Sequence, residues 1–102
     1  MSMALFEWDP AKAEISQRKH GVSFEDAVQV FDDPYSLAEQ DRIVGGEYRW
    51  QTIGLVGGVA LVLVAHTVRE EGYEPVIRII SARRATRKER KRYEQNRQKN
   101  IG

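Results

Sequence analysis

The hydrophobic positions of the chain gather into short runs, and the two runs richest in β-branched residues flank a polar segment at Glu70–Glu74. Such runs on either side of a Gly-containing loop predict an antiparallel hairpin across Val59–Arg84. If all five polar residues form the loop, pairing outward from it puts His66 opposite Arg78 on one face of the sheet.

A second hairpin is predicted directly before the first. Glu47–Val56 has the composition of a strand, and the Gly57-Gly58 that follows is typical of a two-residue turn. That turn places Arg49 opposite His66. Arg49, His66 and Arg78 then form a polar row across three adjacent strands, which a single β-bulge would displace.

The same registers divide both hairpins into two faces. The face expected to form the core, under two amino-terminal helices, carries Trp50, Leu61, Leu63, Ala65, Ile77 and Ile79. The other face carries the polar row with Gln51, Val62, Val64, Val68 and Ile80. An imidazole and a guanidinium among aliphatic side chains are costly unless something uses them, so the row is the predicted functional centre.

Two helices are expected before the hairpins. After a short strand at Leu5–Trp8, Asp9-Pro10 supplies an N-cap and a proline at the first helical position, and Gly21 ends that helix. Ser23 opens a second helix, whose apolar stripe reaches Phe31.

The remaining pattern predicts a strand at Tyr35–Asp41, a polar loop at Arg42–Gly46, and a basic helix opened by a capping box from Thr86 to Glu89. Tyr93 is the main large apolar residue on that helix. The expected fold is therefore α+β: an antiparallel sheet with two amino-terminal helices on one face and a basic carboxy-terminal helix.

Length and composition limit the possibilities. A chain of 102 residues suits a single domain, 1–102, with 86–102 as a basic helical tail. It has no cysteine, no apolar run approaching the ~20 residues that cross a bilayer, and no visible signal peptide, so we expect a cytoplasmic protein with no membrane partner.

Charge is unevenly distributed along the chain. Residues 1–82 hold 7 Lys/Arg and 13 Asp/Glu, whereas residues 83–102 hold 9 and 2. An acidic body with a basic tail favours a polyanionic partner, although a solvated helix that aids solubility has the same pattern.

The titratable residues narrow the chemistry. Two histidines without cysteines or helical ligand pairs argue against a metal site, and no phosphate-loop or nucleophile-elbow motif is present, so no cofactor is expected. Histidine with arginine and lysine suits RNA cleavage, which needs a base for the 2′-hydroxyl, cations for the phosphorane and an acid for the leaving oxygen. Arg49 and Arg78 could clamp the phosphate beside His66.

Structural explanations compete with each of these roles. His66 could be a packed sheet histidine, Arg78 an ion-pair partner of Glu47 or another carboxylate, and Lys19 a cation placed by helix-capping preference. Arg69, Arg83 and Arg84 could be ordinary surface charges.

Several segments together resemble one known family. FEWDPAKAE, KHGVSFEDAVQVFDDP, GEYRWQTIG, HTVRE and IRIISARRATRKERKRYE resemble the BrnT toxins of bacterial type II toxin–antitoxin systems, in order over roughly residues 5–95. The resemblance implies a compact ribonuclease of the RelE/ParE-like superfamily. It also implies inhibition by a BrnA antitoxin, whose DNA-binding domain lets the complex repress its own operon.

The family's motifs map onto Lys19-His20-Gly21, His66-Thr67 with Arg69, and Ile77-Arg78 through Arg84; Ser16 stands where an Asn is often expected. The combined prediction is a metal-independent endoribonuclease toxin that inhibits translation. Its candidate catalytic residues are His66, Arg78, Arg49, His20 and Lys19, with RNA backbone contacts from Arg69, Arg83, Arg84 and Arg87. The alternatives are a ParE-like toxin that cuts nothing and a non-catalytic module that docks an antitoxin.

Overall fold

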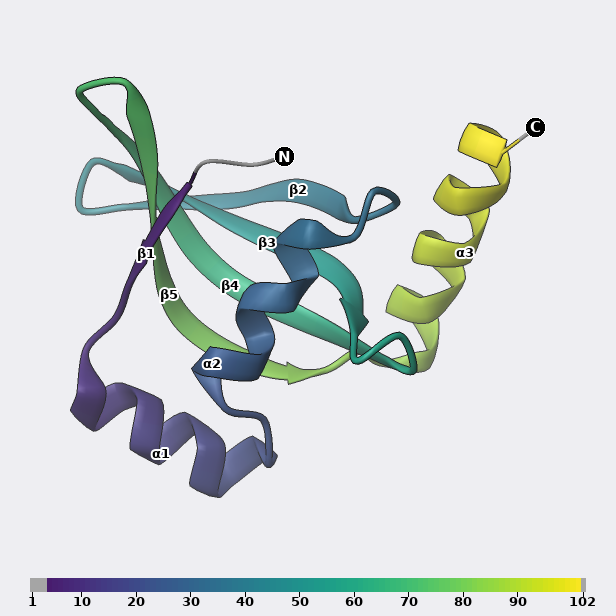
Figure 1. Cartoon of the computed structure of the whole chain (residues 1–102), viewed down its shortest axis with the longest axis horizontal. Helices are drawn as coiled ribbons and strands as arrows, with labels where there is room; N and C mark the ends of the chain where they lie inside the picture. Colours follow the sequence, from purple (N-terminus) through teal and green to yellow (C-terminus); the bar gives the residue numbers. More distant parts are fainter. Residues whose placement is uncertain (1–3, 102) are drawn as a thin grey trace.

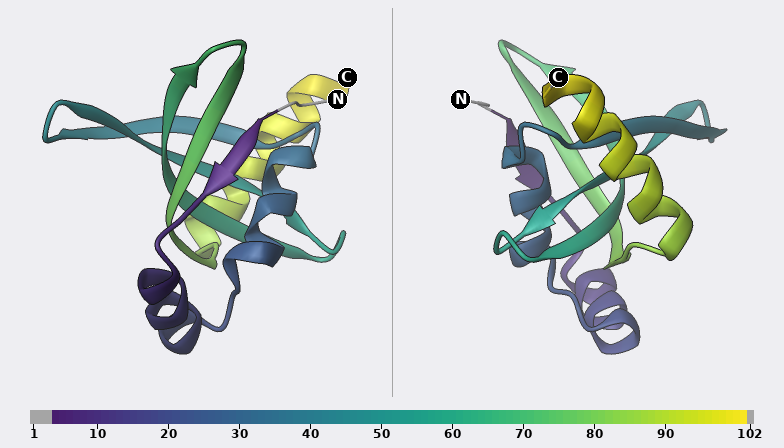
Figure 2. Two further views of the ribbon diagram at one scale, coloured as in Figure 1. Left: turned by 60° about the vertical axis from the view of Figure 1, so that its left-hand side comes forward. Right: turned by 90° about the vertical axis from the view of Figure 1, so that its right-hand side faces the viewer.

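The computed structural model describes residues 4–101, in which five strands form one sheet with helices on both faces (Figures 1 and 2). In chain order the elements are β1 (Leu5–Glu7), α1 (Pro10–His20), α2 (Phe24–Ala27), the 3₁₀ helix η1 (Val28–Asp32), β2 (Leu37–Val44), β3 (Glu47–Val56), β4 (Ala60–Glu71), β5 (Glu74–Arg84) and α3 (Arg87–Ile101). The single-domain assignment over 1–102 remains a prediction, and its two ends lie outside the described residues.

The sheet is mixed rather than antiparallel. Its strand order is β1-β5-β4-β3-β2, and β1 runs parallel to β5, with Leu5 opposite Val76 and Glu7 opposite Arg78. The expectation of an antiparallel sheet is correct for the three consecutive pairings β2–β3, β3–β4 and β4–β5. It fails for β1, because that strand reaches β5 through a long crossover that no local turn signal records.

The start of each predicted helix is confirmed by its cap. Asp9 accepts a hydrogen bond from the Ala11 amide at 2.9 Å, and Ser23 accepts one from the Asp26 amide at 3.1 Å. Gly21 ends α1 with a φ of 75°, the left-handed conformation that glycine adopts without penalty. The second helix is shorter than its apolar stripe suggests, since α2 passes into η1 after Ala27.

One core lies between the sheet and the amino-terminal helices. It contains Phe24, Ala27, Val30, Val62, Val64, Ile77, Ile79 and Ala82. Gly54 of β3 permits the close approach of η1, since a Cβ at this position would lie 2.8 Å from the Val30 carbonyl oxygen.

A second, smaller core attaches α3 to the opposite face of the sheet, where Tyr93 packs with Ile53 and Leu63 (Figure 2). The predicted core face is therefore wrong for β4: Val62 and Val64 face the amino-terminal helices, while Leu61 and Leu63 face α3. Both faces of the sheet are covered at this end, which is why β4 is apolar on both sides.

The strand registers explain that reversal. The loop between β3 and β4 has three residues instead of two, because Val59 joins the two glycines and Val56 pairs with Ala60. His66 consequently pairs with Trp50, not Arg49. A shift of one residue turns every side chain of a strand to the other face.

The β4–β5 hairpin also departs from the predicted register. Its turn is Gly72-Tyr73, and a bulge between Ala65 and His66 leaves Ile80 of β5 without a direct partner, so that His66 pairs with Ile79 and Thr67 with Arg78. The predicted row of Arg49, His66 and Arg78 is therefore wrong. Because side chains alternate along a strand, the imidazole faces the amino-terminal helices while both arginines face the other way.

Candidate functional site

His66 lies within the core between the sheet and η1. Its side chain is only 4% exposed, and its ring meets the Phe31 ring edge-on with centroids 4.9 Å apart. Nε2 is 2.7 Å from the Thr52 hydroxyl, and Nδ1 is 3.4 Å from the Thr67 carbonyl oxygen. The carbonyl can only accept, so Nδ1 carries the proton and the Thr52 hydroxyl donates to Nε2.

Burial also decides the charge of this histidine. Loss of solvation lowers the pKa of His66 to about 4 from an ordinary value of 6.5, and the Thr67 carbonyl offsets only part of the shift. The ring is therefore neutral near pH 7. With both nitrogens engaged and no open path to RNA, it is poorly placed for proton transfer.

Arg78 and Arg69 converge on a carboxylate of β1. Arg69 donates to Glu7 Oε2 at 3.1 Å, and Arg78 Nη1 lies 3.5 Å from Glu7 Oε1. These arginines, with the Arg69 hydrogen bond as the largest cause, lower the pKa of Glu7. The pairing ties β1 to β5 and β4, so part of the positive charge of both arginines is already neutralised.

Arg49 is in a different situation. Its Nε is shielded from solvent and has no hydrogen-bond partner within residues 4–101, and no carboxylate there forms an ion pair with it. A shielded N–H without an acceptor is costly, so an incoming anion would gain more here than at a fully hydrated arginine.

Arg49 lines a hollow of about 310 Å³, here called the sheet hollow. The residues around it are Asp41, Arg42, Val44, Arg49, Trp50, Ala65, Ile80 and Ser81. Asp41 is held by Gln51 Nε2 at 3.4 Å and lies 3.9 Å from Arg42 Nε.

A second hollow of about 210 Å³, the helix-edge hollow, lies between α1 and β5. It is lined by Lys12, Ile15, Ser16, Lys19, His20, Ile80 and Ser81. The Ser16 hydroxyl secures α1 to β5, accepting from the Ala82 amide at 3.4 Å and lying 3.5 Å from its carbonyl oxygen. The end of the first helix does reach the sheet, as the roles considered for Lys19 and His20 require.

The two hollows share Ile80 and Ser81. The residues of the β5 bulge therefore separate Arg49 on one side from His20 and Lys19 on the other. Of the five candidate catalytic residues, the structure brings these three around one ridge and leaves His66 and Arg78 elsewhere.

The candidate RNA-backbone residues also divide. Arg83 makes a bidentate hydrogen bond to Glu89 at 2.8 and 3.0 Å, which is the main reason that the pKa of Glu89 falls to about 2. Glu89 also caps α3 by accepting from the Thr86 amide, so the predicted capping box is confirmed. Arg84 and Arg87 are exposed and have no ion-pair partner in the described chain.

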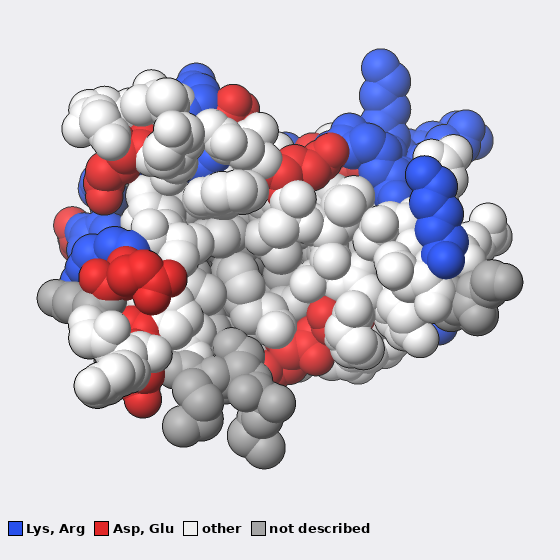
Figure 3. All heavy atoms as spheres, turned by 90° about the horizontal axis from the view of Figure 1, so that it is seen from above, with Lys and Arg blue, Asp and Glu red and all other residues white. Residues whose placement is uncertain are grey.

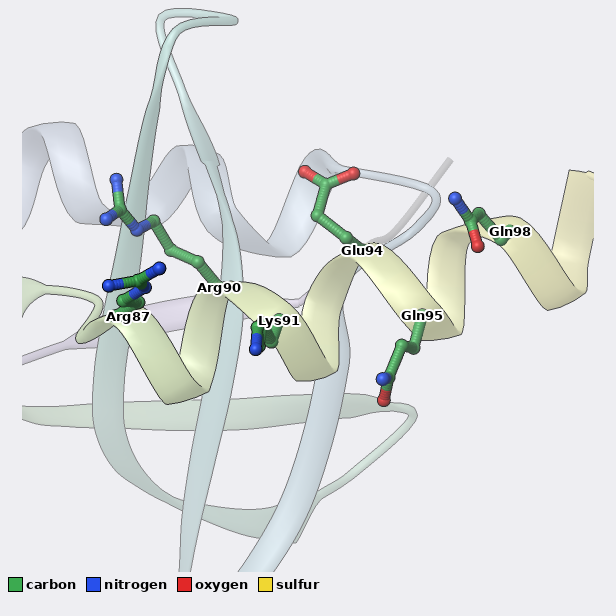
Figure 4. A pocket seen from close by; sticks show the side chains of 6 residues that line it. All are labelled: Arg87, Arg90, Lys91, Glu94, Gln95 and Gln98. Atoms are coloured by element: carbon green, nitrogen blue, oxygen red, sulfur yellow. The ribbon is translucent and has the colours of Figure 1, made fainter.

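α3 carries the strongest concentration of positive charge. Lys and Arg gather over the end of the molecule that α3 forms, whereas both signs are interspersed at the opposite end (Figure 3). A shallow hollow of about 370 Å³ is lined by α3 side chains alone: Arg87, Arg90, Lys91, Glu94, Gln95 and Gln98 (Figure 4). A surface formed by one helix face has no opposing walls. It therefore suits contact with an RNA phosphate backbone better than it suits a ligand that must be enclosed.

Some residues of the site were missed by the sequence reasoning. Lys12 and Asp41 line the hollows but were not singled out, and Ser81 was named only as part of a family motif. The spacing of Lys12, Ser16 and Lys19 places them on one helix face and could have identified the first. Ser81 belongs to the motif from Ile77 through Arg84, but its place between the two hollows depends on the bulge.

Two kinds of feature are absent from the described part of the chain. Residues 4–101 contain no group of three or more His, Cys, Asp or Glu side chains arranged to hold a metal ion. Among the helices described there, none is long and apolar enough to cross a bilayer.

Comparisons with known proteins agree with one another. Residues 8–89 match the sequence profile of the ribonuclease toxin BrnT of type II toxin–antitoxin systems. The fold is similar to the 1.1 Å crystal structure of the Brucella abortus ribonuclease toxin BrnT, with a TM-score of 0.57 and 25% identity over 84% of this chain and 100% of that one. A search of curated proteins gave no match.

Proposed function

This chain belongs to the BrnT family of ribonuclease toxins of type II toxin–antitoxin systems, and from that premise we propose that it cleaves RNA without a metal ion and thereby inhibits translation. The proposed active site is the ridge at Ile80 and Ser81, with the sheet hollow on one side and the helix-edge hollow on the other. This shared boundary is the observation that supports the proposal, because Arg49 and His20 line hollows on the two sides of one strand.

Each residue has a stated role. Arg49 binds the scissile phosphate and satisfies its shielded Nε. His20 exchanges a proton with the 2′-hydroxyl or the leaving 5′-oxygen, since a histidine can act as acid or base near neutrality. Lys19 stabilises the charge that develops on the phosphorane. The products are a 2′,3′-cyclic phosphate and a 5′-hydroxyl.

The other candidates take supporting roles. His66 holds η1 against the sheet, and Arg78 with Arg69 holds β1 through Glu7. Arg84 and Arg87 contact the RNA backbone outside the active site.

The test is cleavage of end-labelled RNA by purified protein in EDTA. We expect wild type to cut, His20→Ala to lose roughly 10²–10⁴-fold in rate, and Arg49→Ala roughly 10²–10³-fold. Arg18→Ala is the matched control, because Arg18 lies on the same helix, pairs with Glu14 and lines neither hollow.

The same variants, expressed inducibly, should lose growth inhibition in the same order. RNA that stays intact both with and without EDTA, although the wild-type protein is well folded, would favour a ParE-like toxin. Cleavage only in the absence of EDTA would contradict a metal-free mechanism. A larger loss with Arg78→Ala than with Arg49→Ala, both folded, would move the site to the β1 end of the sheet.

A toxin of this class has an antitoxin partner. We propose that the partner is BrnA-like, that both act in the cytoplasm, and that operator DNA is bound only through the antitoxin. A gel shift by the complex but not by the isolated toxin would agree, whereas specific binding by the toxin alone would not.

A further inference from the structure

The face of α1 that points toward β5 is unusual for a helix packed on a sheet. Lys12, Ile15, Ser16 and Lys19 follow the spacing by which a surface helix normally presents apolar residues to its core. Here the two outer positions are lysines, and the space between helix and strand is an open hollow of about 210 Å³. The sequence therefore keeps this space accessible instead of filling it.

The walls of the helix-edge hollow combine apolar surface with hydrogen-bond donors. Ile15, which is 62% exposed, and Ile80 supply aliphatic surface. Lys12 and Lys19 supply ammonium groups, and neither forms an ion pair within residues 4–101. No carboxylate lines the hollow, so it is matched to a ligand that carries hydrogen-bond acceptors.

The size of the hollow points the same way. It is several times the ~30 Å³ that a water molecule occupies in the liquid, and smaller than the roughly 300–1,000 Å³ of pockets for drug-sized ligands. One planar ring system fits that range. Because unpaired RNA exposes its base edges, a base beside the scissile phosphate is the component of the substrate that would reach this space.

We propose that the helix-edge hollow binds the base next to the cleaved phosphate and prefers guanine or uracil, whose carbonyl oxygens accept hydrogen bonds from Lys12. This inference rests on the proposed function, which places the phosphate at the Ile80 and Ser81 ridge. Adenine and cytosine present an exocyclic amino group where those bases carry a carbonyl oxygen, and a donor facing an ammonium group is unfavourable. Lys12 is thus a specificity residue, distinct from the catalytic His20.

The experiment uses short RNAs with a single cut site and each of the four bases on either side of it. We expect wild type to cleave substrates with guanine or uracil on one side about 5- to 100-fold faster than those with adenine or cytosine. Inosine, which keeps the guanine carbonyl, should behave as guanine, and 2-aminopurine should behave as adenine. In Lys12→Met the preference should collapse, because the ammonium donor to the base carbonyl is lost.

Two further measurements distinguish a failure of this inference from a failure of the proposed function. Binding of RNA with a 2′-deoxynucleotide at the cut site reports base preference even if no variant cleaves, so the proposed function can fail without deciding this inference. Arg18→Ala is the matched control and should retain the preference. Uniform cleavage or binding across the four bases, or a preference unchanged in both Lys12→Met and Ile15→Ala, would overturn the assignment.

Discussion

The two nitrogens of the His66 ring are both engaged by the sheet, one by the Thr52 hydroxyl and one by the Thr67 carbonyl. Burial penalises the protonated ring, because these two hydrogen bonds replace only part of the solvation that a charged imidazole loses. The protonation of this histidine therefore affects the free energy of unfolding.

The pH dependence of unfolding should reveal this. The unfolded chain takes up a proton near pH 6.5 that folded His66 accepts only near 4, so stability is full above about pH 6.5 and falls as the pH drops toward 4. The expected loss is roughly 2 kcal/mol between pH 7.5 and 5, measured by urea unfolding. His66→Asn should be less stable at pH 7.5 but lack most of this dependence; an equal dependence in both proteins would contradict the assignment.

Gly54 gives a second single-residue prediction. Gly54→Ala places a methyl group 2.8 Å from the Val30 carbonyl oxygen and 2.9 Å from Val30 Cγ1, so η1 must move away from the sheet. We expect a loss of about 1–3 kcal/mol, measured by thermal or urea unfolding. Because one clashing atom belongs to the backbone, Val30→Ala should not rescue the variant, and a full rescue would show that only the side chain matters.

Among the elements, α3 contacts the body through the hydroxyl of Tyr93, which is held by Asp33. One oxygen of that carboxylate accepts from the Tyr93 hydroxyl at 2.6 Å and from the Leu55 amide at 2.9 Å, and the other accepts from the Tyr35 amide. Burial and the adjacent Asp33 raise the pKa of Tyr93 well above its usual range. Tyr93 is the fully buried large side chain of a helix that is otherwise mostly polar, and it fixes α3 beside an ion pair from Arg92 to Glu39.

Tyr93→Phe removes the hydroxyl and keeps the ring. We expect a loss of about 1–2 kcal/mol, because Asp33 retains its amide donors but loses a charge-assisted hydrogen bond. Urea unfolding gives the magnitude, and Tyr48→Phe, at an exposed position in β3, is the control. An effect no larger than that of the control would show that α3 is held by other contacts.

The elements were more predictable than the way in which they face one another. Caps at Asp9, Ser23 and Thr86 could be read from sequence, because each depends on residues within one helical turn. The arrangement of the site could not be read from sequence, since it depends on two effects of one residue each. Val59, which is 87% exposed, joins a loop that two glycines alone could have made, and a bulge appears at Ile80. Lys19, His20 and Arg49 were identified as residues, but not as neighbours of one ridge.

At the scale of the whole molecule, the separation of charge gives α3 a role distinct from the hollows (Figures 3 and 4). Its exposed Arg87, Arg90 and Lys91 lie along the first turns of the helix. In the proposed complex they bind phosphates, which adds affinity without selecting a sequence.

Replacing Arg87, Arg90 and Lys91 together by glutamine should therefore weaken RNA binding and flatten its salt dependence. With about 0.7 unit of slope for each phosphate contact on a single strand, the slope of log affinity against log salt should fall by roughly 2 units. Fluorescence anisotropy with non-cleavable RNA between 50 and 200 mM salt measures this slope, over affinity changes of up to ~10²-fold. The set of cleaved positions should stay the same, and an altered cleavage pattern would assign α3 to base recognition.

The parallel pairing of β1 with β5 has a consequence for how the protein is made. β1 can join the sheet only after residues 76–78 have been synthesised, although β1 itself leaves the ribosome well before them. Until then the β5 edge is open and Glu7 cannot neutralise Arg69 and Arg78. A chain that lacks a complete β5 therefore cannot seat β1 in the sheet and cannot form the ridge at which we place its activity.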